Sequence, residues 1–222
     1  MIITIDGPAG SGKSTAARKL AARLGIAYLD TGAMYRAIAL AALRAGVCLS
    51  DEAALIETAR AASIDVDCGP THTRVTLNGV DVSEAIRTMA VNQATNYVAR
   101  IRAIRRLLVE KQRAIGEKLG SLVTEGRDQG SVVFPNADVK FFLDASLERR
   151  AMRRYQELTA DGEDASYELI MENLRLRDGN DQCQWAPLLE PDTAVRIDTT
   201  PMSIPEVIER LLEEINRKSR RE

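Results

Sequence analysis

The sequence predicts an α/β fold in which a central parallel sheet is covered by helices on both faces. A short apolar run at residues 2–6 leads through a glycine-rich loop into a helical pattern at 13–24. Further short apolar runs, at 122–124, 139–143 and 195–197, alternate with helical patterns. Strands that alternate with helices in this way are typical of parallel sheets buried on both faces.

Helical spacing is clear at residues 13–24, where apolar residues recur every three or four positions from Ala17 to Leu24. Further helices are expected at residues 33–45, 52–62, 101–119, 147–159, 167–177 and 204–218. The stretch 64–82 breaks this rhythm, because its short alternating segments are separated by the turn sequences GPTH and NG. We therefore expect a small antiparallel β insert there.

Composition excludes several classes of protein. The chain has 222 residues, of which 45% are hydrophobic, enough for one main domain with a small inserted subdomain. A formal net charge of -2 gives no long-range attraction for nucleic acid or anionic membranes. No apolar run approaches the roughly 20 residues needed to span a bilayer, and the N-terminus lacks the pattern of an export signal. We expect a cytoplasmic monomer with neither nucleic-acid nor membrane partners.

The cysteines and the histidine narrow the chemistry further. Cys48, Cys68 and Cys183 are widely separated and form no CxxC pair, which argues against a zinc ribbon and a disulfide scaffold. His72 is the single histidine and lies in the polar, turn-like stretch GPTHT, which argues against histidine-based catalytic triads and multi-histidine metal sites. The chemistry must rely on lysine, arginine, aspartate and Mg²⁺.

The sequence GPAGSGKS, from Gly7 to Ser14, fits the phosphate-binding pattern G-x-x-x-x-G-K-[ST] between a strand and a helix. Its backbone N–H groups and the start of the helix would face the phosphates of ATP. Lys13 would supply a catalytic charge to the β- and γ-phosphates, and the Ser14 hydroxyl would bind Mg²⁺. The residues expected to bind ATP are Gly7, Pro8, Ala9, Gly10, Ser11, Gly12, Lys13, Ser14 and Thr15.

The segment DTGAMYR lies about where a second strand should end and a helix begin. Thr31 can cap that helix, and Arg36 lies one turn in, on a side able to reach an anion. On these residues alone, ordinary helix capping explains the pattern equally well.

Arg127 and Asp128 follow the apolar run SLVT. They are therefore expected at the carboxyl end of a parallel strand, where open α/β sheets bind ligands. The alternative is a surface pair in a loop.

Two helices carry clusters of arginines. Arg102, Arg105 and Arg106 point away from an apolar stripe, which on its own is typical of a solvated face. Arginines also share one arc of the helix at 147–159, where like charges four residues apart cost a few tenths of a kcal/mol unless an anion offsets them. These arginines are Arg149, Arg150, Arg153 and Arg154. We expect a phosphate partner there, with Arg153 and Arg149 neutralising the transferring group as a lid closes.

Several segments recur in an order that resembles the bacterial cytidylate kinase family. They are DGPAGSGKS, DTGAMYR, NGVDVSEAIRT, EGRDQGSVVFP and KFFLDAS, and together they cover essentially the whole chain. NGVDVSEAIRT and GRDQGSVVFP are far more specific than the phosphate loop. The resemblance implies MgATP-dependent transfer of the γ-phosphoryl group to CMP or dCMP.

The resemblance also implies an architecture and a substrate site. We expect a three-layer P-loop fold with a parallel sheet of five strands, a nucleotide-binding insert at about 63–98 and a helical lid at about 149–188. Arg36, Arg127 and Arg177 resemble ligands of the acceptor phosphate, and Asp181 resembles the partner of its sugar hydroxyls. Arg105 and Asp128 resemble readers of the cytosine, and Thr31 and Asn96 resemble further substrate contacts.

Two positions depart from the family pattern. Gln184 stands where the family has an arginine, and Asn96 stands where it has a serine that contacts the base. These changes leave open a kinase of another small acceptor such as UMP, and a nucleotide-binding homologue without activity. The insert and the GRD segment argue against the first alternative, and the retained Lys13 and Ser14 argue against the second.

Overall fold

The structure is a computed structural model that describes residues 1–160, 162, 164–190 and 192–219. The chain divides into two compact units. The first unit comprises residues 1–24 and 123–222, and the second unit comprises residues 25–122. The predicted boundaries of an insert at 63–98 and a lid at 149–188 stay predictions.

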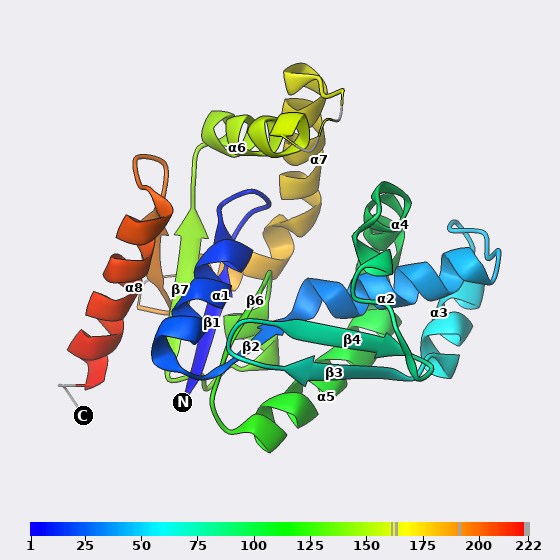
Figure 1. Cartoon of the computed structure of the whole chain (residues 1–222), viewed down its shortest axis with the longest axis horizontal. Coiled ribbons are helices and arrows are strands. Elements are labelled where there is room, and N and C mark those ends of the chain that lie inside the picture. The colour runs from blue at the N-terminus through cyan, green and yellow to red at the C-terminus, as the bar shows by residue number, and fades with distance from the viewer. Residues whose placement is uncertain (161, 163, 191, 220–222) are drawn as a thin grey trace. The chain divides into compact units, whose positions relative to one another are not determined.

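The first unit contains the start and the end of the chain (Figure 1). Its strands are β1 (Ile2–Asp6), β6 (Leu122–Gly126), β7 (Val139–Asp144) and β8 (Val195–Asp198). Its helices are α1 (Lys13–Leu24), α6 (Leu147–Ala160), α7 (Tyr167–Trp185) and α8 (Ile204–Ser219). Two short turns complete it, the π-helical η2 (Gln129–Val133) and the 3₁₀-helical η3 (Ala186–Leu189).

The second unit begins with strand β2 and ends with a long helix. Its strands are β2 (Ala27–Asp30), β3 (Ile64–Cys68), β4 (Thr73–Leu77) and β5 (Val80–Asp81). Its helices are α2 (Thr31–Arg44), α3 (Glu52–Ala61), α4 (Met89–Arg100) and α5 (Arg102–Leu119), with the 3₁₀ turn η1 (Ala85–Arg87).

Five strands form the central sheet in the order β2-β6-β1-β7-β8. β1 runs parallel to β7, with Ile3 opposite Val139, and β7 runs parallel to β8. Parallel strands end at the same edge of a sheet, which is the edge where open α/β sheets bind ligands. The predicted α/β class and the central parallel sheet of five strands are confirmed.

The strands of the first unit supply its core. Ile3 and Ile5 of β1 and Phe141 and Leu143 of β7 expose none of their surface. β1 is buried without interruption from Ile3 to Asp6 instead of alternating between buried and exposed residues, as expected of a parallel strand covered on both faces. α1 packs against α8 in the same unit, and its face of small residues around Leu20 is fully buried.

The predicted antiparallel insert is confirmed as a separate sheet of β3, β4 and β5. β3 and β4 pair antiparallel, with Val66 opposite Val75. Asn78 and Gly79 join β4 to β5 with φ of 52° and 79°. Positive φ at both positions is what a tight two-residue hairpin requires, and asparagine followed by glycine adopts it most readily.

Most helices lie within two residues of their predicted bounds, and α1 coincides with its prediction. α7 continues eight residues beyond the predicted end at Arg177. α4 was not predicted, because only Val91, Ala94 and Val98 are buried on it and polar residues separate them. None of the described helices is long and apolar enough to cross a membrane.

Candidate active site

The predicted glycine-rich loop lies between the end of β1 and the start of α1. Gly7, Gly10 and Gly12 have φ of 142°, 78° and 90°, a region that L side chains rarely adopt. A Cβ atom on Gly7 would also collide with the backbone oxygen of Leu143 in β7. The loop can therefore wind closely against β7 only because residue 7 is glycine.

Lys13 is the first residue of α1, and only 5% of its surface is exposed. Its Nζ donates a hydrogen bond of 2.7 Å to the backbone oxygen of Pro8, which holds the ammonium group inside the loop. Burial, and next the charge of Arg127, lower the pKa of Lys13 to about 7, while Glu125 acts in the opposite direction. A phosphate bound in the loop would supply the negative charge that this buried amine needs to stay protonated.

Ser14 donates a hydrogen bond of 3.0 Å from its Oγ to Oε1 of Glu125. Glu125 lies at the carboxyl end of β6 and is buried. Two oxygen ligands of the kind that Mg²⁺ prefers therefore meet beside the loop. The sequence did not single out Glu125, although an acidic residue at the end of a strand next to a phosphate loop was a usable signal.

Asp6 at the end of β1 is fully buried. Its two carboxylate oxygens accept hydrogen bonds of 2.8 Å from the backbone N–H groups of Gln129 and Gly130. Burial raises the pKa of Asp6 to about 7, the charge of Asp128 acts in the same direction, and the two backbone donors oppose the shift. Asp6, which the sequence analysis also missed, ties the phosphate-loop strand to η2.

The predicted GRD segment, residues 126–128, lies immediately before η2. Arg127 donates from Nε to Oδ2 of Asp181 on α7, at 2.9 Å, and from Nη1 to the oxygen of Gly126. Asp128 is buried and leads directly into η2. The structure thus brings together two residues predicted for the acceptor, one on each side of an ion pair.

Arg177 lies on α7 one turn before Asp181 and keeps part of its surface open to solvent. Loss of solvation lowers the pKa of Arg177, the charge of Arg127 lowers it further, and Asp181 opposes both. Arg127 and Arg154 therefore act on Arg177 with like charge, and the carboxylates of Asp181 and Asp178 offset part of it.

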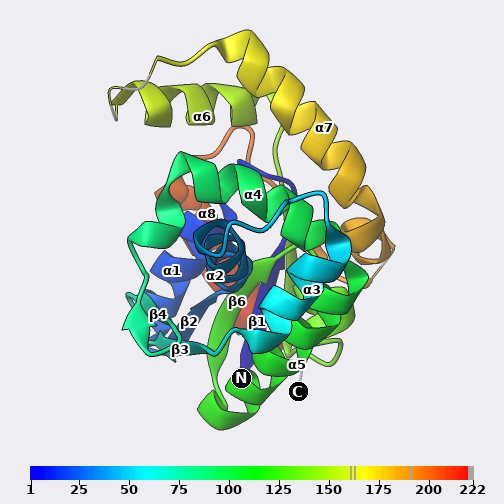
Figure 2. The same ribbon diagram turned by 90° about the vertical axis from the view of Figure 1, so that its right-hand side faces the viewer.

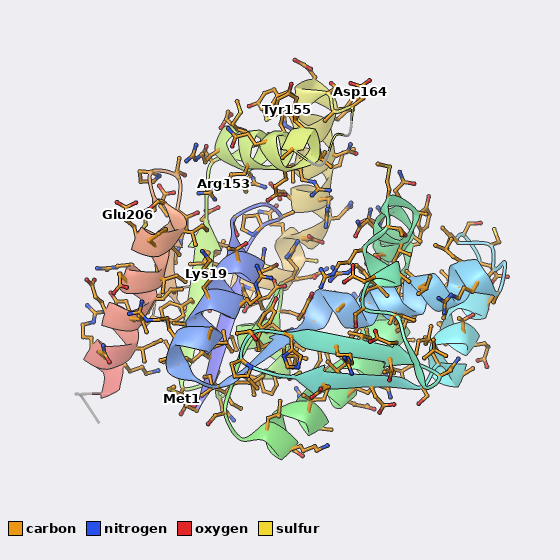
Figure 3. All side chains as sticks on the ribbon, in the orientation of Figure 1. Met1, Lys19, Arg153, Tyr155, Asp164 and Glu206 are labelled. Atoms are coloured by element: carbon orange, nitrogen blue, oxygen red, sulfur yellow. The ribbon has the colours of Figure 1, made fainter. Side chains whose placement is uncertain are left out.

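Arg153 projects from α6 (Figure 3). Its guanidinium donates to both oxygens of Thr199, at 3.2 Å to Oγ1 and 2.7 Å to the backbone oxygen. Thr199 Oγ1 in turn lies 3.2 Å from the backbone oxygen of Ser11 in the phosphate loop. Loss of solvation lowers the pKa of Arg153, and the charge of exposed Arg149 lowers it further. The sequence did not single out Thr199.

The expectation that four arginines of α6 share one outward arc is wrong for Arg150. Arg150 is only 5% exposed, whereas Arg149 and Arg154 are exposed. With about 100° between successive residues, Arg150 lies only about 60° around the helix from Leu147, whose side is the buried one. It therefore points inward, and its contacts are described below.

In the second unit, α2 begins at Thr31, and the cap is Asp30 instead of the predicted Thr31. Asp30 Oδ1 accepts from the N–H of Ala33, because Asp30 keeps an extended backbone at the end of β2. Its other oxygen accepts a hydrogen bond of 2.8 Å from Nη2 of Arg36. The Nε of Arg36 is buried and has no hydrogen-bond partner within the described part of the chain.

Of the three residues predicted to contact the base, Asp128 lies in the GRD segment described above, and the other two lie on neighbouring helices of the second unit. Asn96 is exposed on α4. Arg105 is partly buried on α5 and donates from Nη1 to the oxygen of Ala99 at 3.4 Å. The roles of Asn96, Arg105, Thr31 and Arg36 stay predictions.

Replacing Gly7 and Gly25 by alanine in separate variants should distinguish the cost of a positive φ from the cost of a steric collision. Both have positive φ, but a Cβ at Gly25 meets nothing within 4 Å. We expect Gly25→Ala to lower the free energy of unfolding by about 1–2 kcal/mol. Gly7→Ala should lower it by about 3 kcal/mol or more, and should also abolish ATP binding. Urea unfolding of the two variants measures both losses of free energy. Equal losses would contradict the close contact with Leu143.

Asp6→Asn should change how stability depends on pH. The folded chain keeps a proton on Asp6 up to about pH 7, whereas the unfolded chain releases it near 3.8. The stability contributed by this proton is full below about pH 4 and is lost as pH rises to about 7. The advantage of the unsubstituted chain over Asp6→Asn should therefore shrink by up to about 1.4 kcal/mol per unit between pH 5 and 7. Urea unfolding of both proteins from pH 5 to 8 tests this, and a difference that does not vary with pH would disprove it.

Known proteins resemble this chain over nearly its whole length. The family model described as cytidylate kinase matches residues 3–217. A cytidylate kinase of Caldanaerobacter subterraneus subsp. tengcongensis is 48% identical over 221 residues, which cover 99% of this chain and 96% of that protein. The cytidylate kinase of Bacillus subtilis is 44% identical, with 98% and 97% covered.

A solved structure of an uncharacterized protein from Eubacterium ventriosum shares the fold, with a TM-score of 0.55 at 12% identity over 98% of both chains. The residues matched by the family model include both the phosphate loop and the GRD segment. The chain belongs to the cytidylate kinase family.

Proposed function

We propose that this enzyme transfers the γ-phosphoryl group of ATP to CMP or dCMP, giving ADP and CDP or dCDP. The observation that carries the proposal is the match of the family over residues 3–217, which includes the phosphate loop and the GRD segment. Phosphoryl transfer asks little covalent chemistry of a protein, so positioning and charge stabilisation suffice. No general base is required in this scheme.

The donor phosphates are assigned to the loop from Gly7 to Ser14, with Thr15 beside it. Its glycines leave the backbone N–H groups accessible, and the N-terminus of α1 adds a partial positive charge. Lys13 is held by Pro8 O in a position from which it can turn to the phosphates. A phosphate would replace that carbonyl as the partner of the ammonium group.

We assign Mg²⁺ to the pair Ser14 and Glu125. Their oxygens are 3.0 Å apart, so they can bind one ion directly or through water. When bound, the ion would offset the negative charge of the ATP phosphates during transfer. Glu125 is buried, and we infer that its carboxylate orients the Ser14 hydroxyl.

We assign the acceptor nucleotide to the residues that resemble the family's substrate contacts. Arg36, Arg127 and Arg177 would bind its phosphate, since guanidinium groups match phosphate oxygens in a bidentate manner. The buried Nε of Arg36, which has no hydrogen-bond partner among the described residues, supports this role. Asp181 would accept from the sugar hydroxyls. The remaining substrate contacts are assigned to Thr31, Asn96, Arg105 and Asp128.

We also propose a monomer that acts in a reducing compartment, the cytoplasm. The thiols of Cys48 and Cys183 are free and exposed. In an oxidising compartment such thiols are prone to disulfide exchange and oxidation. Size-exclusion chromatography of the purified protein would test the monomer.

Substrate choice tests the proposed reaction directly. ADP formation from MgATP is measured with CMP, dCMP, UMP, AMP and GMP offered separately. We expect CMP and dCMP to exceed the other acceptors by about tenfold or more, because a site built to pair with cytosine leaves buried polar groups unmatched with other bases. Activity with UMP alone, or with no nucleotide, would overturn the proposal.

The role of α6 is tested by Arg153→Ala, with Arg154→Ala as the matched control. Arg154 is exposed and pairs with Glu157, so its loss should change kcat by less than about threefold. Loss of Arg153 should lower kcat about 100-fold, because a positive charge beside the transferring group is removed. Combining Arg153→Ala with Arg149→Ala should lower kcat further. Normal CMP turnover in that double variant would disprove the role.

A further inference from the structure

Arg150 differs from its neighbours on α6, because its guanidinium is buried and almost fully hydrogen-bonded. Its Nε donates to the oxygen of Ala145 at 3.0 Å, and its Nη1 donates to the oxygen of Ala9 at 3.1 Å. A bidentate ion pair with Asp178 completes the set, at 3.1 Å from Nη1 and 2.6 Å from Nη2. Four of the five N–H groups are thereby used.

These contacts join three elements of the first unit: the phosphate loop through Ala9, the segment after β7 through Ala145, and α7 through Asp178. An apolar cluster of Ala9, Ala151 and Leu174 joins the phosphate loop, α6 and α7 as well. Figure 2 shows α6 and α7 as successive helices of the chain. The polar and the apolar contacts therefore fix the same arrangement.

The phosphate loop packs tightly on Arg150. A Cβ atom at Gly10 would lie 3.1 Å from Cβ of Arg150, closer than side chains normally approach. Gly10 also has a φ of 78°, so the loop at this point is shaped to pass over α6. A shift of Arg150 would consequently displace the phosphate loop at Gly10.

On α7, Asp178 lies next to Arg177 and three residues before Asp181, which shares its side of the helix. Asp181 is the residue that pairs with Arg127 of the GRD segment. If Asp178 loses its partner, α7 loses the ion pair that fixes this turn. The assigned acceptor contacts on α7 would then no longer be held in register with the phosphate loop.

We propose that the ion pair between Arg150 and Asp178 is a positioning bridge between the donor loop and the acceptor-binding turn of α7. This inference rests on the proposed function of the same site. Arg150 acts through Asp178 and the backbone of Ala9, without touching a substrate. Its near-complete set of protein partners separates it from Arg153, which donates only to Thr199 in the described part of the chain.

The test is Asp178→Asn, with Glu172→Gln as the matched control. Glu172 is an exposed residue of the same helix, so the control makes the same chemical change away from the bridge. Asp178→Asn leaves Arg150 in contact with Ala9. We expect the KM for CMP to rise about tenfold or more and the KM for ATP to change by less than about threefold. Glu172→Gln should match the unsubstituted enzyme in both constants.

A double-mutant cycle separates positioning from general stability. Arg150→Lys keeps the charge but loses the bidentate geometry, so it should raise the KM for CMP as Asp178→Asn does. The two substitutions together should be no worse than the stronger single one. Asp178→Glu keeps a carboxylate and should recover most of the CMP affinity. If Asp178→Asn does not fold, Arg150→Lys alone carries the comparison of the two KM values.

Two results would overturn the bridge. One is equal loss of affinity for CMP and ATP together with a lower Tm, which a merely structural ion pair would give. The other is a pair of substitutions whose effects on the KM for CMP simply add. Failure of the proposed function is distinguishable, because the unsubstituted enzyme would then not phosphorylate CMP at all.

Discussion

The carboxylate of Asp6 is the contact on which the order of the candidate site depends. Asp6 is the last residue of β1, immediately before the phosphate loop, and its side chain accepts hydrogen bonds from two consecutive backbone N–H groups of η2. One side chain thus fixes the start of the donor loop relative to the GRD segment. A buried carboxylate without such donors would be costly, so the hydrogen bonds and the burial depend on each other.

Charge is concentrated around this contact and is incompletely balanced within the protein. Loss of solvation and the charge of Arg127 both lower the pKa of Lys13, and the same two influences lower the pKa of Arg177. Glu125 and Asp181 offset part of this positive charge. The positive charge that is not offset is unfavourable in the free enzyme, and bound phosphate groups would relieve the repulsion. Preorganised charge of this kind favours binding of anions, because no further reorganisation is needed when they arrive.

Local patterns in the sequence predicted local structure well. The strand, loop and helix from Ile2 to Leu24 have the predicted bounds, because a continuous apolar run and a glycine motif determine them. The hairpin turn at Asn78 and Gly79 was also predicted, because asparagine followed by glycine readily adopts the positive φ that a tight turn requires. α4 was missed because three buried residues give too weak a period, and Thr31 was taken as the cap although Asp30 before it has the extended backbone that capping needs.

The site was predicted in part for the same reason. The residues of the phosphate loop carry a motif, so their identity and spacing were sufficient. Asp6, Glu125 and Thr199 owe their places to hydrogen bonds across more than 100 positions of the chain, for Asp6 with Gln129, for Glu125 with Ser14 and for Thr199 with Ser11. No local pattern encodes such pairings. They follow from which strand ends lie together, and only the folded sheet fixes that.

The arginines of α6 illustrate how tertiary structure divides a uniform sequence pattern. Four arginines within six residues were expected to need an external anion to offset their repulsion. Two of them are balanced within the protein, since Arg150 pairs with Asp178 and Arg154 with Glu157. Arg149 and Arg153 are left without an ion pair in the described part of the chain, and the charge of the first lowers the pKa of the second. The repulsion that an incoming phosphate would relieve is therefore confined to this pair, one turn apart, of which Arg153 lies beside Gly12 of the phosphate loop.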